Sequence, residues 1–495
     1  MTRLKHICFM LTLLSIGISK ANAQEVYAEI NGTASTGKYA PLWLSANKQG
    51  LLSVRPNSAY QRLGIHDNTT LSSDTANPWK LRYAADVTLA QNAEHTFMIH
   101  QLYGEIEYKK LRLLAGQKEN EIDMRNNSLT SGGLSQGINA HPIPKVLLDV
   151  SYFSVPYTKG WWKMRGRVGF GKTTDGDWQQ RWVDKTSRQR YTSNTLYHEK
   201  AIYWKFGRED KFPLTFEPGL QMMTQFGGTS YNATGRNHED GAPIIHPEDF
   251  NAFWHAFWPM GSEDVTDGMH PNAAGNTVGS YNIALTWTEE NWRARAYFER
   301  VFEDQSMLTV QYGIFDHLLG LDLKLPDNPY VSNIVVEHMS TKDQAGPVYH
   351  DATTNISESY TGIDNYYNHH LFTGWQHWGM AIGHPLITSP LYNDDNIITF
   401  RNNRIRALHI GVDGQPSERL TWRALATFTR NWGTYAKPFD DIISQNHFMA
   451  EATYIPKNMN GCTATLALAL DNGKLIGNSF GAQLTIRKTI DLDKK

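Results

Sequence analysis

The chain of 495 residues predicts an all-β protein, a transmembrane antiparallel β-barrel. Segments of about ten residues alternate apolar and polar side chains, with the charges gathered on one face. An export signal precedes these segments, and no later apolar stretch of about 20 residues is long enough to span a membrane as a helix. An apolar outside and a charged inside are what a barrel in a bilayer requires.

Residues 1–23 have the features of a secretory signal peptide. Basic Arg3 and Lys5 precede an apolar run over residues 7–18, and Ala21-Asn22-Ala23 is a small-x-small cleavage site. The run is too short to cross a bilayer as a helix, so an uncleaved anchor is the weaker alternative. We therefore expect the signal to be cleaved during export.

Composition narrows the class of protein further. Of the 2 cysteines, Cys8 leaves with the signal and Cys462 stays alone, so no intramolecular disulfide can form. The 15 Trp, 23 Tyr and 20 Phe favour strands and interfaces. A net charge of -2 excludes a strongly basic nucleic-acid binder, and we expect no nucleic-acid partner.

The mature chain divides into a short leading segment and one long domain. The segment Thr33–Gly64 alternates poorly and contains Pro41, so residues 24–70 are expected to form a periplasmic or plug segment, helical in part. Residues 71–495 carry no Pro/Ser/Gly-rich linker. They are expected to form a single barrel, because a closed barrel can be long and still be one unit.

The alternation is clearest from Trp79 to Leu89, where Arg82 and Asp86 oppose an apolar face. At about 26 residues per strand and connection, the mature chain allows roughly 16–20 strands. Tryptophans at segment ends suggest an interfacial belt. The other expected strands include residues 102–109, 111–115, 162–170, 281–288, 292–299, 422–429 and 462–468.

A secreted sandwich or a soluble barrel would also alternate, with the apolar face as its core. The length of the segments, their unbroken succession and the aromatic residues at their ends favour the membrane barrel. Polar stretches separate the strands, for example residues 173–191, 228–249 and 339–360. We expect these to be the longer outward loops, with tight turns on the other side.

A series of motifs occurs in the order typical of one family. The motif residues are Ser131, Gly132, Asn139, Pro142 and Pro144, then His198 and Lys200, and later Gln344, Gly346 and Pro347. With these motifs the chain resembles the Wzi family of outer-membrane capsule-assembly proteins, in particular its Bacteroidetes branch, over roughly residues 80–485.

The resemblance implies a barrel of about 18 strands in the outer membrane of a Gram-negative bacterium. Family members help to assemble capsule at the cell surface and hold exported polysaccharide as lectins. Two features depart from the family: the segment before the barrel is short for a helical bundle, and the C-terminal residues 484–495 lack a terminal aromatic residue.

Mixtures of aromatic and polar residues on the loops are candidates for binding a glycan. Rings pack against the C–H faces of a sugar, and amides, carboxylates and guanidinium groups bond its hydroxyls. The alternative is that these loop aromatics only pack on one another. The candidates are Trp178, Arg181, Tyr231, Arg236, Tyr366, Tyr367 and Asn368.

Charged residues on the expected inner face allow two interpretations. They can form an ion-pair network that fills the lumen, or a cationic lining that guides an acidic glycan. The residues are Arg165, Arg167, Arg293, Arg295, Arg404, Arg406, Glu105 and Glu107.

Metal and catalytic signals are weak. No HExxH, CxxC or zinc-ligand spacing occurs, and we expect no metal and no cofactor. Ser135 and His141 could be nominated as a nucleophile and base, but Gly132 and Gly133 favour a turn element there. We expect no enzymatic activity.

The sequence thus predicts a non-catalytic, lectin-like barrel for assembly and attachment of capsular polysaccharide. A porin-like channel for small solutes or glycans is the alternative. The expected partners are capsular or other surface polysaccharide, outer-membrane lipid and the barrel-insertion machinery. We expect a monomer.

Overall fold

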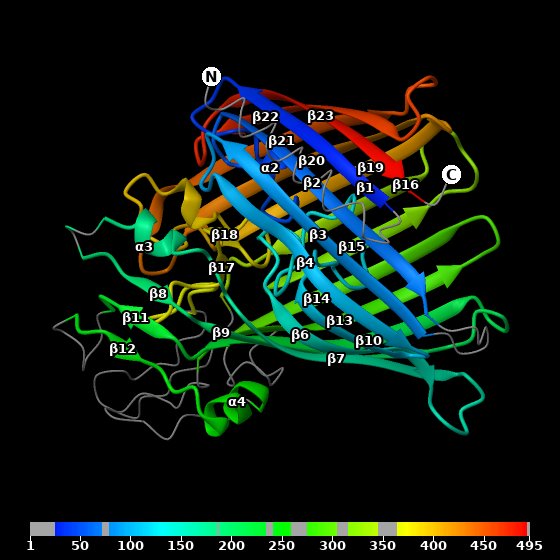
Figure 1. The fold of residues 1–495 in the computed structure, drawn as a ribbon, viewed down its shortest axis with the longest axis horizontal. Helices are drawn as coiled ribbons and strands as arrows, with labels where there is room; N and C mark the ends of the chain where they lie inside the picture. The colour runs from blue at the N-terminus through cyan, green and yellow to red at the C-terminus, as the bar shows by residue number, and fades with distance from the viewer. Residues whose placement is uncertain are drawn as a thin grey trace.

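Eighteen antiparallel strands form a closed barrel in the computed structural model (Figure 1). Strands that follow one another around the wall are neighbours in sequence, and β1 pairs with both β2 and β23, which closes the barrel. The predicted fold class is confirmed. The structure describes residues 25–71, 79–184, 186, 188–233, 241–258, 275–303, 315–344 and 364–492.

The wall strands are 7 to 17 residues long. They are β1 (Glu25–Ser35), β2 (Asn57–Thr70), β3 (Trp79–Gln91), β4 (Phe97–Tyr108), β5 (Leu111–Gln117), β6 (Lys145–Ser154), β7 (Trp162–Lys172), β9 (Leu196–Phe206), β10 (Leu214–Phe226), β13 (Asn276–Thr288), β14 (Arg293–Glu303), β15 (His317–Lys324), β16 (Asn333–Ser340), β19 (Ile405–Ser417), β20 (Leu420–Gly433), β21 (Pro438–Tyr454), β22 (Cys462–Gly473) and β23 (Ser479–Asp491).

Short elements occur in the connections. None of the helices among the described residues has the length and apolarity needed to span a membrane. These elements are α2 (Leu42–Ser45), α3 (Trp178–Trp182), α4 (Phe250–Phe257), η4 (Pro390–Tyr392), the three-stranded sheet of β8 (Tyr191–Ser193), β11 (Thr229–Tyr231) and β12 (Ile244–Ile245), and the pair β17 (Gln376–His377) and β18 (Met380–Ala381).

The barrel begins at residue 25 and not at residue 71 as expected. β1 and β2 pair with each other, and β2 pairs with β3, so the segment 24–70 supplies two wall strands. The exposed side chains of β1 are mostly small, as at Ala28 and Ala34, which explains the weak alternation. Residues 1–23 lie outside the described residues, so the signal peptide stays a prediction.

Residues 36–56, between β1 and β2, do turn into the barrel. The indole N–H of Trp43 donates to Thr427 on β20 at 3.1 Å, and the backbone N–H of Leu42 donates to Asp471 on β22 at 2.9 Å. All four residues of α2 are buried. The short helix therefore lies against the inner wall.

The two ends of the barrel differ in their connections. Glu25 pairs with Asp491, so both described termini lie at one end, where a two-residue turn, Lys109-Lys110, also joins β4 to β5. At the other end, residues 118–144 and 364–404 join wall strands. We call these the short-turn end and the long-loop end; α3, β8 and β11 lie at the latter, on the left in Figure 1.

Aromatic rings gather on the outward face near the short-turn end. Trp79 stacks on Tyr108 with ring centroids 4.5 Å apart, and Trp162 stacks on Phe206 at 5.9 Å. Exposed Trp292 lies at the same end of β14. This placement is typical of the belt at a membrane interface.

The wall separates apolar from polar side chains by alternation, as on β22. Leu466, Leu468 and Leu470 are 43–49% exposed, whereas Ala467 and Asp471 between and beside them are almost fully buried. Large apolar side chains thus face outward and the interior is packed, which is the arrangement of a barrel surrounded by hydrocarbon.

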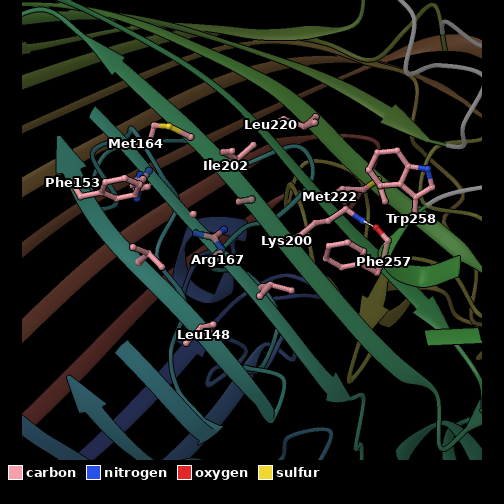
Figure 2. Close-up of a pocket in the computed structure, with 15 residues that line it drawn as sticks. Leu148, Phe153, Met164, Arg167, Lys200, Ile202, Leu220, Met222, Phe257 and Trp258 are labelled. Carbon is pink, nitrogen blue, oxygen red and sulfur yellow. Dashed lines mark hydrogen bonds between the residues drawn. The ribbon is translucent and has the colours of Figure 1, made fainter. Parts of the chain in front are cut away.

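Helix α4 packs on the outside of the wall. Glu199 on β9 points inward to Lys145, so its neighbours His198 and Lys200 point outward. The ring of His198 lies 5.6 Å from that of Phe257, and the Lys200 amine donates to the Phe257 carbonyl (Figure 2). Two outward side chains of β9 therefore fasten the helix.

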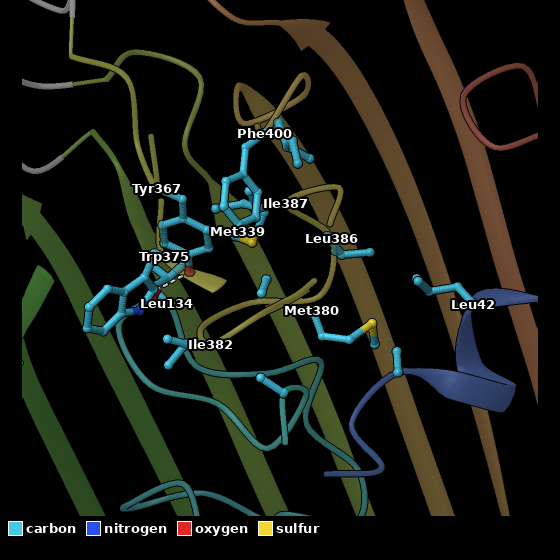
Figure 3. Close-up of a cluster of buried hydrophobic side chains, with 14 of the residues drawn as sticks. Leu42, Leu134, Met339, Tyr367, Trp375, Met380, Ile382, Leu386, Ile387 and Phe400 are labelled. Carbon is cyan, nitrogen blue, oxygen red and sulfur yellow. Dashed lines mark hydrogen bonds between the residues drawn. The ribbon is translucent and has the colours of Figure 1, made fainter. Parts of the chain in front are cut away.

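The interior holds one large apolar core, which is built from residues 118–144, residues 364–404 and the wall. Leu134 comes from residues 118–144, whereas Trp375, Ile382 and Phe400 come from residues 364–404, and these side chains gather beside Met339 of β16 (Figure 3). All of these side chains are buried. The lumen is packed like the core of a soluble domain at this level.

Candidate functional site

One loop, residues 118–144, folds back into the barrel and crosses the lumen. We call it the plug loop. It bonds to strands from different parts of the wall: β2 through Arg62, β7 through Arg167 and β14 through Glu299. Contacts on several sides of the wall mean that the loop closes the interior.

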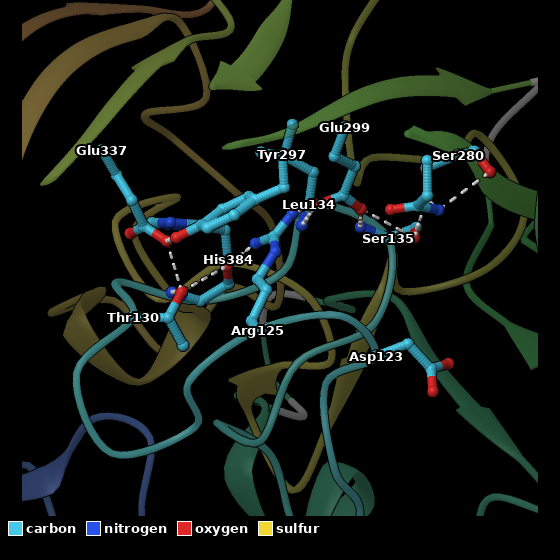
Figure 4. A network of polar contacts seen from close by, with 12 residues as sticks. Asp123, Arg125, Thr130, Leu134, Ser135, Ser280, Tyr297, Glu299, Glu337 and His384 are labelled. Atoms are coloured by element: carbon cyan, nitrogen blue, oxygen red, sulfur yellow. Dashed lines mark hydrogen bonds and ion pairs between the residues drawn. The ribbon is translucent and has the colours of Figure 1, made fainter. Parts of the chain in front are cut away.

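Glu337 holds the middle of the plug loop (Figure 4). Its carboxylate accepts hydrogen bonds from the backbone N–H of Ser131 at 2.7 Å and from the hydroxyl of Thr130 at 2.6 Å. Tyr297 on β14 donates to the same carboxylate. A buried carboxylate is stable only with such donors, so the loop and Glu337 stabilise each other.

Glu299 makes a second attachment a few residues further along. It accepts hydrogen bonds from the backbone N–H groups of Leu134 at 2.9 Å and Ser135 at 3.1 Å. Arg125, also in the plug loop, forms an ion pair with it, and both side chains are at most 3% exposed. The loop thus supplies the charge that neutralises a buried wall carboxylate.

Asp123 fastens the plug loop to a different part of the wall. It pairs with Arg165 at 2.9 Å and Arg167 at 2.7 Å on β7, and the hydroxyl of Tyr203 on β9 donates to it at 2.9 Å. Burial alone would raise the pKa of Asp123, but the two guanidinium groups outweigh it and lower the pKa to about 2. The carboxylate is therefore charged at neutral pH.

Residues 364–404, the covering segment, pack on the plug loop from the long-loop end. The indole of Trp375 donates to the carbonyl of Ser135 at 2.8 Å, and the hydroxyl of Tyr367 donates to the carbonyl of Leu134. All of these side chains are buried. The two inner segments form one body inside the barrel.

The hydroxyls of Ser131 and Ser135 in the plug loop form structural hydrogen bonds. The Ser131 Oγ lies 3.1 Å from Nε2 of His384, and burial lowers the pKa of that histidine to about 3. The Ser135 Oγ donates to Glu299 at 3.1 Å, whereas the His141 ring lies 3.3 Å from the Gln117 amide. Both hydroxyls are fully buried, so their bonds hold the loop in place.

Among the described residues, the charged inner face forms ion pairs, as in the first of the two interpretations. Arg165 and Arg167 pair with the plug loop, as described above. The remaining pairs join adjacent strands, except that Arg295 on β14 reaches past β13 to Glu217 on β10. They are Arg82 with Glu105 (2.6 Å) and Glu107 (2.8 Å), Arg293 with Asp322 (2.9 Å), and Arg295 with Glu217 (3.6 Å).

Arg404 and Arg406 do not line the lumen as expected. On β19, Ile405 and Ala407 are buried whereas Arg406 is exposed, so Arg406 faces outward near the long-loop end. Arg404 precedes the strand and lies over the ring of Tyr435, 3.7 Å from its centroid. A charged residue can face outward here because the end of a strand reaches past the apolar band.

A partly exposed aromatic surface lies at the long-loop end. The rings of Tyr191 on β8 and Tyr231 on β11 stack with centroids 4.6 Å apart and planes only 7° from parallel. α3 lies beside β8 and presents exposed Gln180 and Arg181, and half-buried Asn232 follows β11. We call these five residues the tyrosine patch.

Several predicted glycan-binding residues are in places that a sugar cannot reach. Trp178, Tyr366 and Tyr367 are at most 2% exposed, so the alternative of packing within the protein applies to them. Asn368 is half-buried and donates to the Phe400 carbonyl at 2.9 Å. Arg236 lies outside the described residues and stays a prediction.

Trp178 and its neighbour Gln179 hold α3, the helix that carries two residues of the tyrosine patch. The Trp178 ring stacks on Trp182 with centroids 5.2 Å apart. The adjacent Gln179 accepts hydrogen bonds from the Thr192 backbone N–H at 3.0 Å and from the Thr373 hydroxyl at 2.9 Å. α3 is thereby joined both to β8 and to the covering segment.

The motif residues within the described part of the chain occupy three places: the plug loop, the wall under α4 and the contact of Gln344 with the covering segment. Gly132 has φ +144°, and a Cβ there would lie 2.7 Å from Pro385 in the covering segment, so a side chain cannot fit. Gln344 accepts a hydrogen bond from the Tyr366 N–H at 2.8 Å. Ser131, Gly132, Asn139, Pro142 and Pro144 belong to the plug loop, His198 and Lys200 lie under α4, and Gly346 and Pro347 are outside the described residues.

Sequence reasoning missed two functional candidates, Tyr191 and Asp123. Tyr191 meets Tyr231 only because β8 pairs with β11 across 40 positions of sequence, which no local pattern reveals. Asp123 follows no alternation and precedes the recognised motif. Within the described ranges, no group of three or more His, Cys, Asp or Glu side chains is placed to hold a metal ion.

Comparison with known proteins supports the fold. No protein-family profile and no curated protein sequence matches the chain. Wzi of Escherichia coli, an outer-membrane protein involved in group 1 capsule assembly and described as a carbohydrate-binding β-barrel, superposes with a TM-score of 0.55 at 14% identity, over 97% of this chain and 87% of Wzi. The barrel is thus of the kind found in Gram-negative outer membranes.

Two further solved structures match less well. OprD of Pseudomonas aeruginosa has a TM-score of 0.46 at 7% identity and covers 95% of both chains. OccAB4 of Acinetobacter baumannii has a TM-score of 0.44 at 9% identity, over 95% of this chain and 99% of its own.

Proposed function

We propose that this chain is an outer-membrane barrel that holds a surface polysaccharide at its long-loop end. The tyrosine patch carries the proposal. Its two parallel rings can pack against the C–H face of a sugar, and the adjacent guanidinium and amide groups can bond the hydroxyls. Longer loops of such barrels face the outside of the cell, which would expose the patch to surface glycan.

The closed interior supports a binding role over the porin-like alternative. The plug loop and the covering segment are buried in the lumen and bonded to several wall strands. A solute channel would need a polar path past them. Binding at the mouth needs no such path.

The similarity of fold to Wzi, a carbohydrate-binding barrel involved in capsule assembly, agrees with this proposal. We propose that the glycan is capsular and that the barrel keeps it attached to the cell as a monomer without chemical change. Arg181, at the edge of the patch, would favour an acidic polymer through charge-assisted hydrogen bonds.

Removal of the two rings tests the proposal directly. We expect Tyr191→Ala combined with Tyr231→Ala to lower the affinity of the purified barrel for purified capsule of its own strain at least tenfold, measured by biolayer interferometry. Tyr157→Ala, a fully exposed tyrosine in the turn between β6 and β7, is the matched control and should bind normally. Equal binding by all three proteins would contradict the site.

A deletion strain tests the attachment role separately. The ratio of cell-bound to shed capsule should fall on deletion and recover with the intact gene, but not with the double tyrosine variant. An unchanged ratio would argue against attachment. Conductance of the purified protein in a planar bilayer addresses the alternative, because large stable channels would favour a porin.

A further inference from the structure

An apolar groove runs along the outside of the barrel below α4. Its cavity volume is about 630 Å³, and outward side chains of β7, β9 and β10 line it together with the end of α4 (Figure 2). Six of the lining residues are Met164, Val168, Ile202, Leu220, Met222 and Phe257.

The groove exists because its floor is low and its end is blocked. Gly166 lies between Met164 and Val168 on the outward face of β7 and contributes no side chain. Phe257 and Trp258 rise over the end nearest the long loops. Met164 and Val168 are four residues apart, so this part of the groove follows the strand for roughly 13 Å.

α4 is held firmly enough to form a permanent edge of this groove. Phe253 packs between Phe170 of β7 and Phe226 of β10, with ring centroids 5.3 and 5.1 Å away. The Lys200 amine donates to the carbonyl of Phe257 and lies 5.0 Å from its ring centroid. A lysine at this position satisfies the last carbonyls of the helix.

The exposed face of α4 is suited to a membrane interface. Phe250, Trp254 and Trp258 are between 51 and 81% exposed and would insert among headgroups and upper chain segments. The groove below them lies in the apolar band of the wall and extends from α4 toward the short-turn end, because Met164 is only two residues from Trp162 of the aromatic belt. Hydrocarbon, and not water, therefore meets this surface.

We propose that the groove is a binding site for one acyl chain of a membrane lipid in the leaflet at the long-loop end. The chain would enter beside Trp258 and extend toward Met164, parallel to the wall strands. The Lys200 amine is directed to α4 and not into the groove, so recognition rests on the hydrocarbon chain and not on the headgroup.

Native mass spectrometry of the full-length barrel tests this site. Protein reconstituted in vesicles of phosphatidylglycerol and extracted in mild detergent should retain one lipid. Ile202→Trp fills the groove and should reduce the retained fraction at least fivefold. Leu408→Trp, the same change at an exposed outward position of β19, is the matched control and should retain the lipid. Heat-modified gel migration verifies folding, and Val168→Trp replaces Ile202→Trp if that variant does not fold.

Four outcomes would overturn the proposal. Retention that is equal in wild type and Ile202→Trp, or absent from wild type, would show that the groove holds no specific chain. A strong preference for phosphatidylglycerol over phosphatidylcholine with the same chains would mean headgroup recognition. In vesicles of a phosphatidylcholine with a diazirine in its chain, photolysis should label Ile202 or Met222 more than Leu408; equal labelling would also contradict a groove-bound chain.

Discussion

The plug loop and the tyrosine patch belong to the same barrel but are stabilised in opposite ways. The plug loop gives its backbone N–H groups and Arg125 to buried wall carboxylates, and each contact is sealed from water. The tyrosine patch leaves two rings partly exposed on a small sheet. Water-free polar contacts fix a structure, whereas exposed rings and amides remain available to a ligand.

Replacement of Glu299 should produce the largest difference between the two regions. Glu299→Gln leaves Arg125 buried without its charged partner, and we expect a loss of about 3–5 kcal/mol in the free energy of unfolding. The released plug loop should also allow ion conductance in planar bilayers. The exposed pair of Arg401 and Asp395 provides the control, since Arg401→Gln should change stability by less than about 1 kcal/mol. Unaltered stability of Glu299→Gln would show that the attachment is weak.

Mild acid should have the next-largest effect on folding stability, through the protonation of His384 beneath the plug loop. Burial, its largest influence, outweighs the attraction of Glu337 and places the pKa near 3, below the ordinary 6.5. As the pH falls, the unfolded chain takes up this proton first, so stability present above pH 6.5 is lost progressively down to about pH 3. At pH 5 we expect a loss of about 2 kcal/mol, measured by thermal unfolding.

The variant His384→Asn separates this histidine from other titrating groups. It should reduce the slope of the melting temperature between about pH 6.5 and 5 by the contribution of one histidine. Burial lowers the pKa of His141 and His377 as well, so their proton-binding differences remain. Asp123, with a pKa of about 2, should weaken the fold only at lower pH. A variant that retains the full slope would assign the effect to a different group.

Removal of the Asp123 charge should have a smaller effect. Asp123→Asn leaves Arg165 and Arg167 with weaker acceptors, although Arg167 keeps its contact with Gln136 at 2.9 Å. We expect a loss of about 1–3 kcal/mol in chemical unfolding. Faster cleavage of the plug loop by trypsin, with the wall intact, would locate the change. Cleavage at the wild-type rate would mean that the remaining attachments suffice.

Truncation of the tyrosine patch should change the folding stability least. Tyr191→Ala removes a half-buried ring from the surface, so stability should change by no more than about 0.5 kcal/mol while glycan binding falls. A fall of several kcal/mol would mean that the rings support the small sheet, and the contrast with the plug loop would disappear.

Alternation predicted the wall well where outward side chains are large. β3 and β22 follow the expected faces, because their outward leucines, valines and tryptophans signal the hydrocarbon side. β1 and β2 were assigned to a plug segment, since small outward residues such as Ala28 and Ala34 weaken that signal. A strand of this kind is recognised only through its neighbours.

The candidate site was harder to predict, because loop burial depends on distant partners. Tyr366 and Tyr367 stand among polar residues in sequence, yet the plug loop supplies the surface that buries Tyr367. The sequence pattern predicts Arg406 on the inner face, because charged residues elsewhere on the wall point inward. Ile405 and Ala407 point inward instead, so Arg406 points outward. Local pattern carries no information on which loop fills a lumen.

The pairing of β1 with β23 has a consequence for assembly. Asn31 bonds Thr485 across 454 positions of sequence, so the two edges of the sheet cannot meet until the last strand has been made. Until then both edges carry unpaired backbone groups that invite pairing with other chains. Premature termination anywhere before residue 479 would leave an open sheet, and the newly made polypeptide needs protection along both margins until it joins.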